Sequence, residues 1–203
     1  MVQLYKTTEL EAVNIMLSAI GEAPVSSLAD TSLEDVTVAK NILNETIVDV
    51  QSTSYNFNSE YNYQLTPDAD GNINVPANTV YIKASNRGST PNVDVILRGE
   101  KVYDRKDQTF TFTGKIYVDI SFILEWDDLP QYARRYIAIK SARRFQNRVF
   151  GSDSLHGFTL IDENEALTQM EQNDSRTEDA NILTRSNDIY KIILRNGFRR
   201  YNL

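Results

Sequence analysis

The sequence predicts an α+β fold: a small helical bundle with an inserted antiparallel β domain and a C-terminal arm. Three observations predict it. Apolar residues recur at helical spacing in 1–56 and 127–180, and they alternate with polar residues in 57–126. In 181–203 apolar residues are mixed with cations. With 203 residues, the chain can bury a sizeable core without cross-links. We expect residues 1–56 and 127–180 to form the bundle, 57–126 the β domain and 181–203 the arm.

Two helices are expected before the β domain. Thr8 is a helix-capping residue, and Glu11 three positions later completes a capping box. Gly21 supplies the left-handed position that ends this helix. Ser32 is expected to cap a second helix, whose apolar stripe runs as far as Val50. The short connection predicts that the two helices pack as an antiparallel pair.

The middle of the chain has the period of β-strands. Alternation begins near Tyr61, and the segment 67–71 (Pro-Asp-Ala-Asp-Gly) has turn chemistry. The residues from Ile116 to Trp126 predict the longest strand. The other expected strands carry Tyr63 and Leu65, Ile73 and Val75, Val80 and Ile82, 93–98, Val102 and Tyr103, and Phe110 and Phe112. Strands of this length and spacing indicate an antiparallel sheet or a small barrel.

Helices are expected again after the β domain. Asp128 can cap a helix with Pro130 in its first turn, and this helix is expected to end at Phe150. Thr159 and Asp162 form a second capping pair. They predict a helix with apolar Ile161, Leu167 and Met170 that fades near Asp174.

Several kinds of site are excluded by composition. There is no cysteine and only one histidine, so thiol catalysis and zinc sites built from several histidines or cysteines are excluded. Ser152, Asp153 and His156 share one loop, whereas catalytic triads join residues from separate elements. No apolar stretch is long enough to span a bilayer, and the net charge of −7 opposes general nucleic-acid binding.

The carboxylate groupings have structural explanations. Asp127 and Asp128 suit the start of a helix. Asp68, Asp70 and Asn72 alternate like a calcium loop, but the glycine comes before the position that an EF-hand needs, and no glutamate follows at the twelfth position. We therefore expect no catalytic residue, metal or cofactor.

Short segments along most of the chain resemble segments of one protein family, and they occur in the same order. They are 9–14, 20–28, 39–44, 55–58, 102–105, 128–130, the Lys-Ser-Ala-Arg-Arg-Phe-Gln-Asn-Arg-Val-Phe-Gly run at 140–151, and the acidic stretch 162–171. Together they are similar to tail tubular protein A, the head-to-tail adaptor of short-tailed phages. The sequence after about Thr177 departs from this pattern.

The resemblance implies a structural, non-enzymatic virion protein that is made in the host cytoplasm. In that family twelve copies form a ring between the portal protein and the tail nozzle, tail tubular protein B. Tail fibres attach at the adaptor–nozzle junction, and genomic DNA passes through the lumen without sequence-specific binding. The helical domain contacts the portal, the β domain lies towards the nozzle, and no membrane is involved.

A basic helix is the first candidate interface. Residues 129–150 hold six cations and no acid, and residues 151–180 hold eight acids and one cation. The candidate contacts here are Arg143, Arg144 and Arg148. Two interpretations stay open: a surface facing a portal subunit, a neighbouring copy or DNA, or a solvated helix paired with the acidic helix that follows it.

The C-terminal arm is the second candidate. Its apolar and basic residues are expected to dock on the portal or on a neighbouring subunit, or else to form a short helix packed on the bundle. The candidate residues are Ile189, Tyr190, Ile192, Ile193, Arg195, Arg199 and Arg200.

A rival function belongs to another class. The chain has 11 tyrosines and one tryptophan, and aromatic faces stack on sugars. A virion-associated glycan-binding or glycan-hydrolysing protein is therefore the alternative, although a sheet core explains the same aromatic residues.

Overall fold

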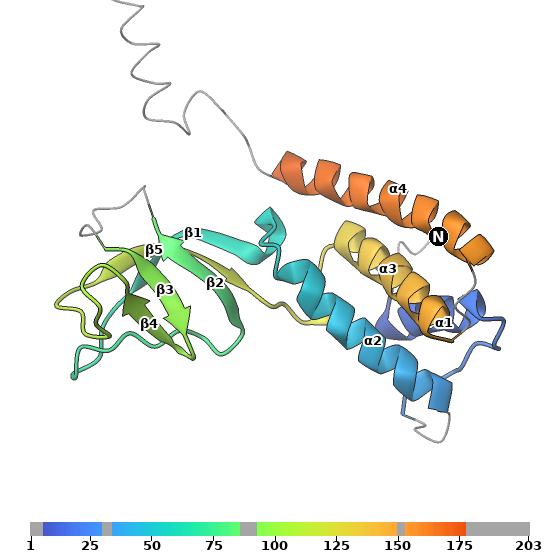
Figure 1. The fold of residues 1–203 in the computed structure, drawn as a ribbon, viewed down its shortest axis with the longest axis horizontal. Coiled ribbons are helices and arrows are strands. Elements are labelled where there is room, and N and C mark those ends of the chain that lie inside the picture. The colour runs from blue at the N-terminus through green and yellow to red at the C-terminus, as the bar shows by residue number, and fades with distance from the viewer. Residues whose placement is uncertain (1–5, 30–33, 86–92, 150–152, 178–203) are drawn as a thin grey trace, which may run out of the picture.

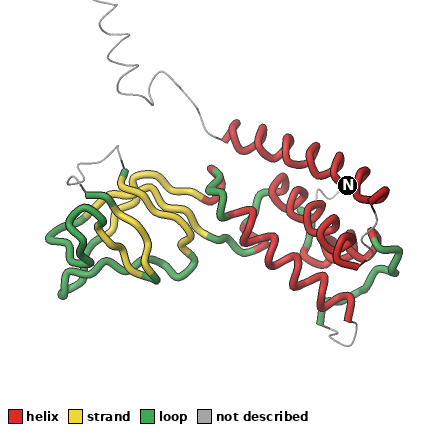
Figure 2. Tube along the Cα trace, viewed as in Figure 1, coloured by secondary structure: helices red, strands yellow, loops and turns green. Residues whose placement is uncertain are grey.

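The protein has a helical part and a β part (Figure 1). The computed structural model describes residues 6–29, 34–85, 93–149 and 153–177. Its helices are α1 (Glu9–Ala19), α2 (Glu34–Gln51), α3 (Gln131–Val149) and α4 (Asp153–Thr177). Figure 2 shows these helices on one side and the strands on the other. The predicted α+β class is confirmed, while the arm, residues 181–203, lies outside the described residues.

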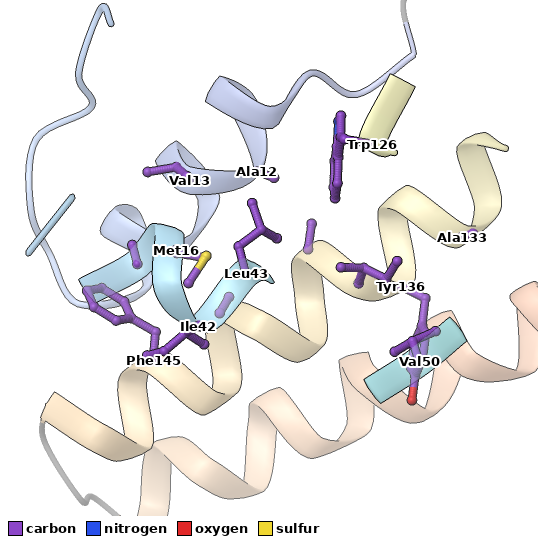
Figure 3. Close-up of a cluster of buried hydrophobic side chains, with 14 of the residues drawn as sticks. Ala12, Val13, Met16, Ile42, Leu43, Val50, Trp126, Ala133, Tyr136 and Phe145 are labelled. Carbon is purple, nitrogen blue, oxygen red and sulfur yellow. The ribbon is translucent and has the colours of Figure 1, made fainter. Parts of the chain in front are cut away.

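The helical part is organised around α3, which contacts α1, α2 and α4. Apolar side chains from all four helices form one buried cluster. Figure 3 shows members of this cluster from α1, α2 and α3. Phe145, Met16 and Leu43 are among its fully buried members. Residues on both sides of the β part in sequence thus share one core, as the discontinuous apolar pattern predicts.

The ends of α1 confirm local sequence rules. The Thr8 hydroxyl accepts a hydrogen bond from the Glu11 amide, and the Glu11 carboxylate accepts one from the Thr8 amide. At the other end, Gly21 has φ +84°. The Glu22 amide donates to the Leu17 carbonyl at 3.0 Å, which completes a Schellman ending. The cap expected at Ser32 lies outside the described residues.

The β part contains two antiparallel sheets. One has the order β1–β5–β2, with β1 at Ser59–Leu65, β5 at Ile116–Phe122 and β2 at Thr79–Ala84. The other is the hairpin of β3 (Val95–Arg98) and β4 (Lys101–Asp104). Buried side chains from both sheets form a second hydrophobic cluster, which includes Val118, Ile120 and Val102.

The turn predicted at 67–71 is present. One oxygen of the Asp68 carboxylate accepts hydrogen bonds from the Asp70 and Asn72 amides, and Gly71 has φ +82°. A Cβ on Gly71 would lie 2.6 Å from the Thr111 side chain, so glycine is required there. Ile73 is fully buried, as alternation predicts, but its neighbours Asn72 and Asn74 make only isolated bridges.

The strand expected at Phe110 and Phe112 does not form. Turns and bends interrupt the backbone between 105 and 114, so this segment makes only isolated bridges, at Thr109 and Thr111.

Strand boundaries differ from the expectation at two places. β5 ends at Phe122, so it is no longer than β1, and Trp126 begins a short 3-10 helix, Trp126–Asp128. The Trp126 side chain enters the helical core because its Nε1 donates to the Thr7 carbonyl at 3.0 Å. Tyr61 is exposed because β1 bulges between Glu60 and Tyr63, where Asn62 has φ +59°.

Two predicted helix starts are also wrong. Asp128 lies in the 3-10 turn, two residues before Pro130, whose carbonyl accepts the first helical hydrogen bonds of α3. α4 begins at Asp153, so Thr159 and Asp162 lie inside it. Ile161 is then exposed, because the face of α4 packed on α3 carries Ala166 and Met170 instead.

Candidate functional site

One of the six cations of α3 is buried. Arg134 is 3% exposed. Its guanidinium donates to three carbonyl oxygens, those of Leu129 at 2.9 Å, Thr7 at 3.0 Å and Asp127 at 2.6 Å. It therefore ties the N-terminal segment and the entry of α3 together. The sequence predicts that Arg134 belongs to a charged helix surface, but the structure shows that its side chain is buried and bonded to backbone carbonyls.

The three predicted contact arginines all have acidic partners within the chain. Arg143 forms an ion pair with Glu163 of α4, and both side chains are largely buried. Arg144 pairs with Asp49 of α2 at 2.6 Å. Arg148 pairs with Glu45 of α2 at 3.6 Å, and both side chains are more than half exposed. Arg148 is thus the most solvent-accessible of the three.

Burial and charge shift two pKa values beside these ion pairs. Burial, with the Glu163 carboxylate, raises the pKa of Tyr136 to about 12. Burial, with the positive charge of Arg144, lowers the pKa of Lys140. Both effects follow from the same partly dry interior between α2, α3 and α4.

We expect the buried Tyr136 to weaken the fold in alkali. An unfolded tyrosine ionises near pH 10, whereas the folded one stays neutral up to about 12. Stability is therefore fully present below pH 10 and lost as pH rises towards 12, by about 1 kcal/mol at pH 11. Tyr136→Phe should lose less stability between pH 8 and 11 than the wild type.

Urea unfolding at the two pH values measures this. Tyr81→Phe is the control, because it removes a hydroxyl from an exposed position. The lowered pKa of Lys140 has the opposite effect, because it makes the folded state more stable as the pH approaches 10.5. Lys140 is present in every variant, so its effect cancels in the comparison. Equal alkaline losses in the wild type and Tyr136→Phe would contradict the assignment.

The junction between the two parts is held by buried amides. The Gln51 side chain donates to the Leu124 carbonyl at 3.0 Å and accepts from the Leu124 amide at 2.8 Å. The Asn58 side chain donates to the carbonyls of Gln51 and Phe122 at 2.8 and 2.7 Å. The outgoing and returning chain segments are therefore fastened to each other where they leave the bundle.

A carboxylate of α4 completes this junction. Asp174 is 5% exposed. It accepts hydrogen bonds from the Asn56 amide at 2.9 Å, the Phe57 amide at 3.0 Å and the Asn56 side chain at 3.2 Å. Asn56 begins the short 3-10 helix Asn56–Asn58 that leads directly into β1. Helix α4 is thus bound to the root of the β part.

The groups weighed for chemistry have other roles where the structure describes them. The backbone of 153–157 is helical where a loop was expected, and Ser152 lies outside the described residues. The Asp68 carboxylate accepts hydrogen bonds from backbone amides of its own turn. Within the described ranges, no three histidine, cysteine, aspartate or glutamate side chains could hold a metal ion. No described helix is long and apolar enough to cross a membrane.

Sequence reasoning missed the junction residues and the burial of Arg134, although spacing marks two of these positions. Asp174 follows Ala166 and Met170 at intervals of four, and Arg134 precedes Ala138 by four, so both lie on buried helix faces. Gln51 and Asn58 carry no comparable signal. The predicted arm contacts, Ile189, Tyr190, Ile192, Ile193, Arg195, Arg199 and Arg200, lie outside the described residues.

The fold and these contacts define a two-part α+β protein whose buried polar groups fasten segments to one another. Residues 10–180 match the family described as tail tubular protein. The chain is also 30% identical over 146 residues to tail tubular protein A of Klebsiella phage KP34, which covers 72% of this chain and 75% of that protein. The chain therefore belongs to the tail tubular protein family and is a phage tail structural protein.

Proposed function

We propose that this chain is the head-to-tail adaptor of a short-tailed phage. In this proposal copies of it, twelve in number, form a ring between the portal protein and the nozzle, tail tubular protein B. Tail fibres attach at the junction with the nozzle, and genomic DNA passes through the lumen. The role is structural, without enzymatic activity. Family membership over residues 10–180 is the observation that carries the proposal.

The geometry of the junction supports an adaptor. An adaptor must present one surface to each of two neighbours at a fixed relative orientation. Here the helical part, proposed as the portal-binding domain, is fastened to the β part, proposed as the nozzle-binding domain. The fastening residues are Gln51, Asn58 and Asp174. Three buried polar connections specify one geometry better than apolar contacts alone.

Co-expression with the portal protein of the same genome tests the adaptor role. Negative-stain electron microscopy should show portals bearing an additional ring, and its symmetry gives the copy number. A chain ending at Ile182 should fold but lose affinity for the portal, since we propose that the arm docks there. Two folded proteins that never associate would contradict the proposal and direct the search to host glycans.

Arg148 is the α3 cation that we expect to face a partner. Arg148→Glu should weaken portal attachment about tenfold while leaving the fold nearly unchanged, because an exposed ion pair is worth about 0.2–1 kcal/mol. Its partner Glu45 is equally exposed. Sedimentation of portal complexes at graded adaptor concentrations measures the change.

The swap Glu45→Arg with Arg148→Glu is the control. It restores an ion pair within the chain but leaves the partner-facing charge of residue 148 reversed. Attachment should therefore stay weak in the swapped chain. Full recovery would mean that Arg148 serves only the contact between α2 and α3.

A further inference from the structure

The β3–β4 hairpin has one buried face and one face that carries a basic aromatic patch. Val95, Val102 and Asp104 are buried on the inner side. The register pairs Ile96 with Tyr103 and Arg98 with Lys101, which places these four side chains on the opposite face. Both Arg98 and Lys101 are exposed. We call the set Ile96, Arg98, Lys101, Tyr103 and Phe110 the hairpin patch.

Aromatic stacking holds this patch in place. The Arg98 guanidinium carbon lies 3.6 Å from the centroid of the Tyr103 ring. The Tyr103 ring packs edge-to-face against Phe110, with centroids 4.8 Å apart, and Phe110 is 38% exposed. Arginine and tyrosine are among the residues enriched at the centres of protein interfaces, and a pre-ordered side chain loses less entropy on binding.

The charges of the patch break a rule of sheet pairing. Arg98 and Lys101 stand directly opposite each other across the turn at Gly99 and Glu100. Like charges at directly opposed positions destabilise a hairpin. A nearby carboxylate would remove this repulsion, and violations of a local rule concentrate at functional positions.

A protein carboxylate suits the patch better than a nucleic-acid phosphate. The chain carries a net charge of −7, which repels DNA at long range. The rings of Tyr103 and Phe110 pack edge-to-face against each other instead of standing apart to receive a base. A surface of protein carboxylates therefore matches the two exposed cations of the patch.

A second copy of the chain offers such a surface. Glu125, Asp127 and Asp128 are exposed within four consecutive residues beside the junction, and the Asp127 side chain is 95% exposed. Arg134 lies 3.8 Å from the Asp127 carboxylate, but it is buried and directs its donors at carbonyl oxygens. A contact between two different patches is heterologous, the kind that closes a ring of identical subunits.

We propose that the hairpin patch binds the acidic surface around residues 125–128 of a neighbouring copy of this chain. The inference rests on the ring in the proposed function and names the surfaces that close it. Because the contact is electrostatic and exposed, it weakens as salt rises.

Cross-linking tests the contact in the full chain, which contains no native cysteine. Glu100→Cys with Glu125→Cys leaves both cations and two of the three acids in place. In tails assembled by co-expression with the other tail proteins, a bismaleimide reagent should give a ladder of covalent oligomers. Glu100→Cys with Thr168→Cys, on the exposed side of α4, is the matched control and should not give one.

Charge exchange provides the second measurement. Arg98→Glu with Lys101→Glu should abolish the ladder of the cysteine pair. Adding Asp127→Lys and Asp128→Lys to the same chain should restore at least half of it. Arg135→Glu with Arg176→Glu makes the same change in net charge on exposed helical positions and should leave the ladder intact.

The outcomes separate this inference from the proposed function. A chain that enters tails without giving a ladder overturns the contact but leaves the adaptor role standing. A chain that enters no tails and gives no ladder overturns both. Retention of a short DNA duplex by the wild type but not by Arg98→Glu with Lys101→Glu would assign the patch to DNA and overturn the protein contact.

Discussion

Arg134→Ala should lower the free energy of unfolding of the helical part by about 3 kcal/mol. The substitution removes a buried guanidinium that satisfies the carbonyls of Leu129, Thr7 and Asp127. Hydrogen bonds to charged groups are worth about 1.5–3 kcal/mol each, but the Thr7 carbonyl keeps its bond from the Trp126 ring. The sum is therefore smaller than three independent bonds would give.

Urea unfolding followed by Trp126 fluorescence measures this loss, since Trp126 is the single tryptophan and lies in the helical core. Arg135→Ala is the matched control, because Arg135 is the adjacent exposed arginine and should change stability by less than about 0.5 kcal/mol. Arg134→Lys should recover less than half of the loss, because one ammonium cannot replace a fork directed at three carbonyls. Equal effects at positions 134 and 135 would show that the buried contacts contribute nothing.

Local signals allowed the helical ends of the fold to be predicted. The capping box at Thr8 and Glu11 and the terminating Gly21 involve residues within one or two turns, so the sequence states them directly. The same rule failed at Thr159 and Asp162. A capping pair also fits inside a helix, and α4 is already helical from Asp153. A local pattern permits a start but does not exclude an earlier one.

Contacts between distant segments could not be predicted in the same way. The Trp126 ring nitrogen bonds to Thr7, 119 positions away, and this contact draws the expected strand end into the helical core. The Asp174 carboxylate binds residues 117 and 118 positions away. Burial of these polar residues depends on how whole elements meet, which composition and period do not specify.

In the candidate interface, one ion pair could be predicted from the sequence and two could not. The expected pairing of the basic helix with the acidic helix after it holds for Arg143 and Glu163. Arg144 and Arg148 instead pair with Asp49 and Glu45 of α2. The two arginines are four residues apart in α3, and the two acids are four residues apart in α2. A row of positive charge therefore faces a row of negative charge along the α2–α3 contact. That match becomes visible only once the two helices are known to be neighbours.

Asp174→Ala should release the C-terminal half of α4 from the root of the β part. The carboxylate accepts bonds from the Asn56 and Phe57 amides, so its removal leaves two backbone donors without this acceptor. A lost charged acceptor costs about 1.5–3 kcal/mol, and the packing of Met170 one turn earlier should loosen with it. We expect a total loss of about 3 kcal/mol, the second large effect in the molecule.

Amide hydrogen exchange resolves where this loss occurs. Protection should fall in 166–177 and at 56–60, while α1 should keep its own rates, because its cap does not involve α4. Glu171→Ala removes an exposed carboxylate from the same helix and should leave exchange unchanged. If Asp174→Ala instead accelerates exchange uniformly, the carboxylate supports the whole core and not the junction. A local opening would mean that Asp174 couples the C-terminal half of α4 to the root of the β part, beside the connections made by Gln51 and Asn58.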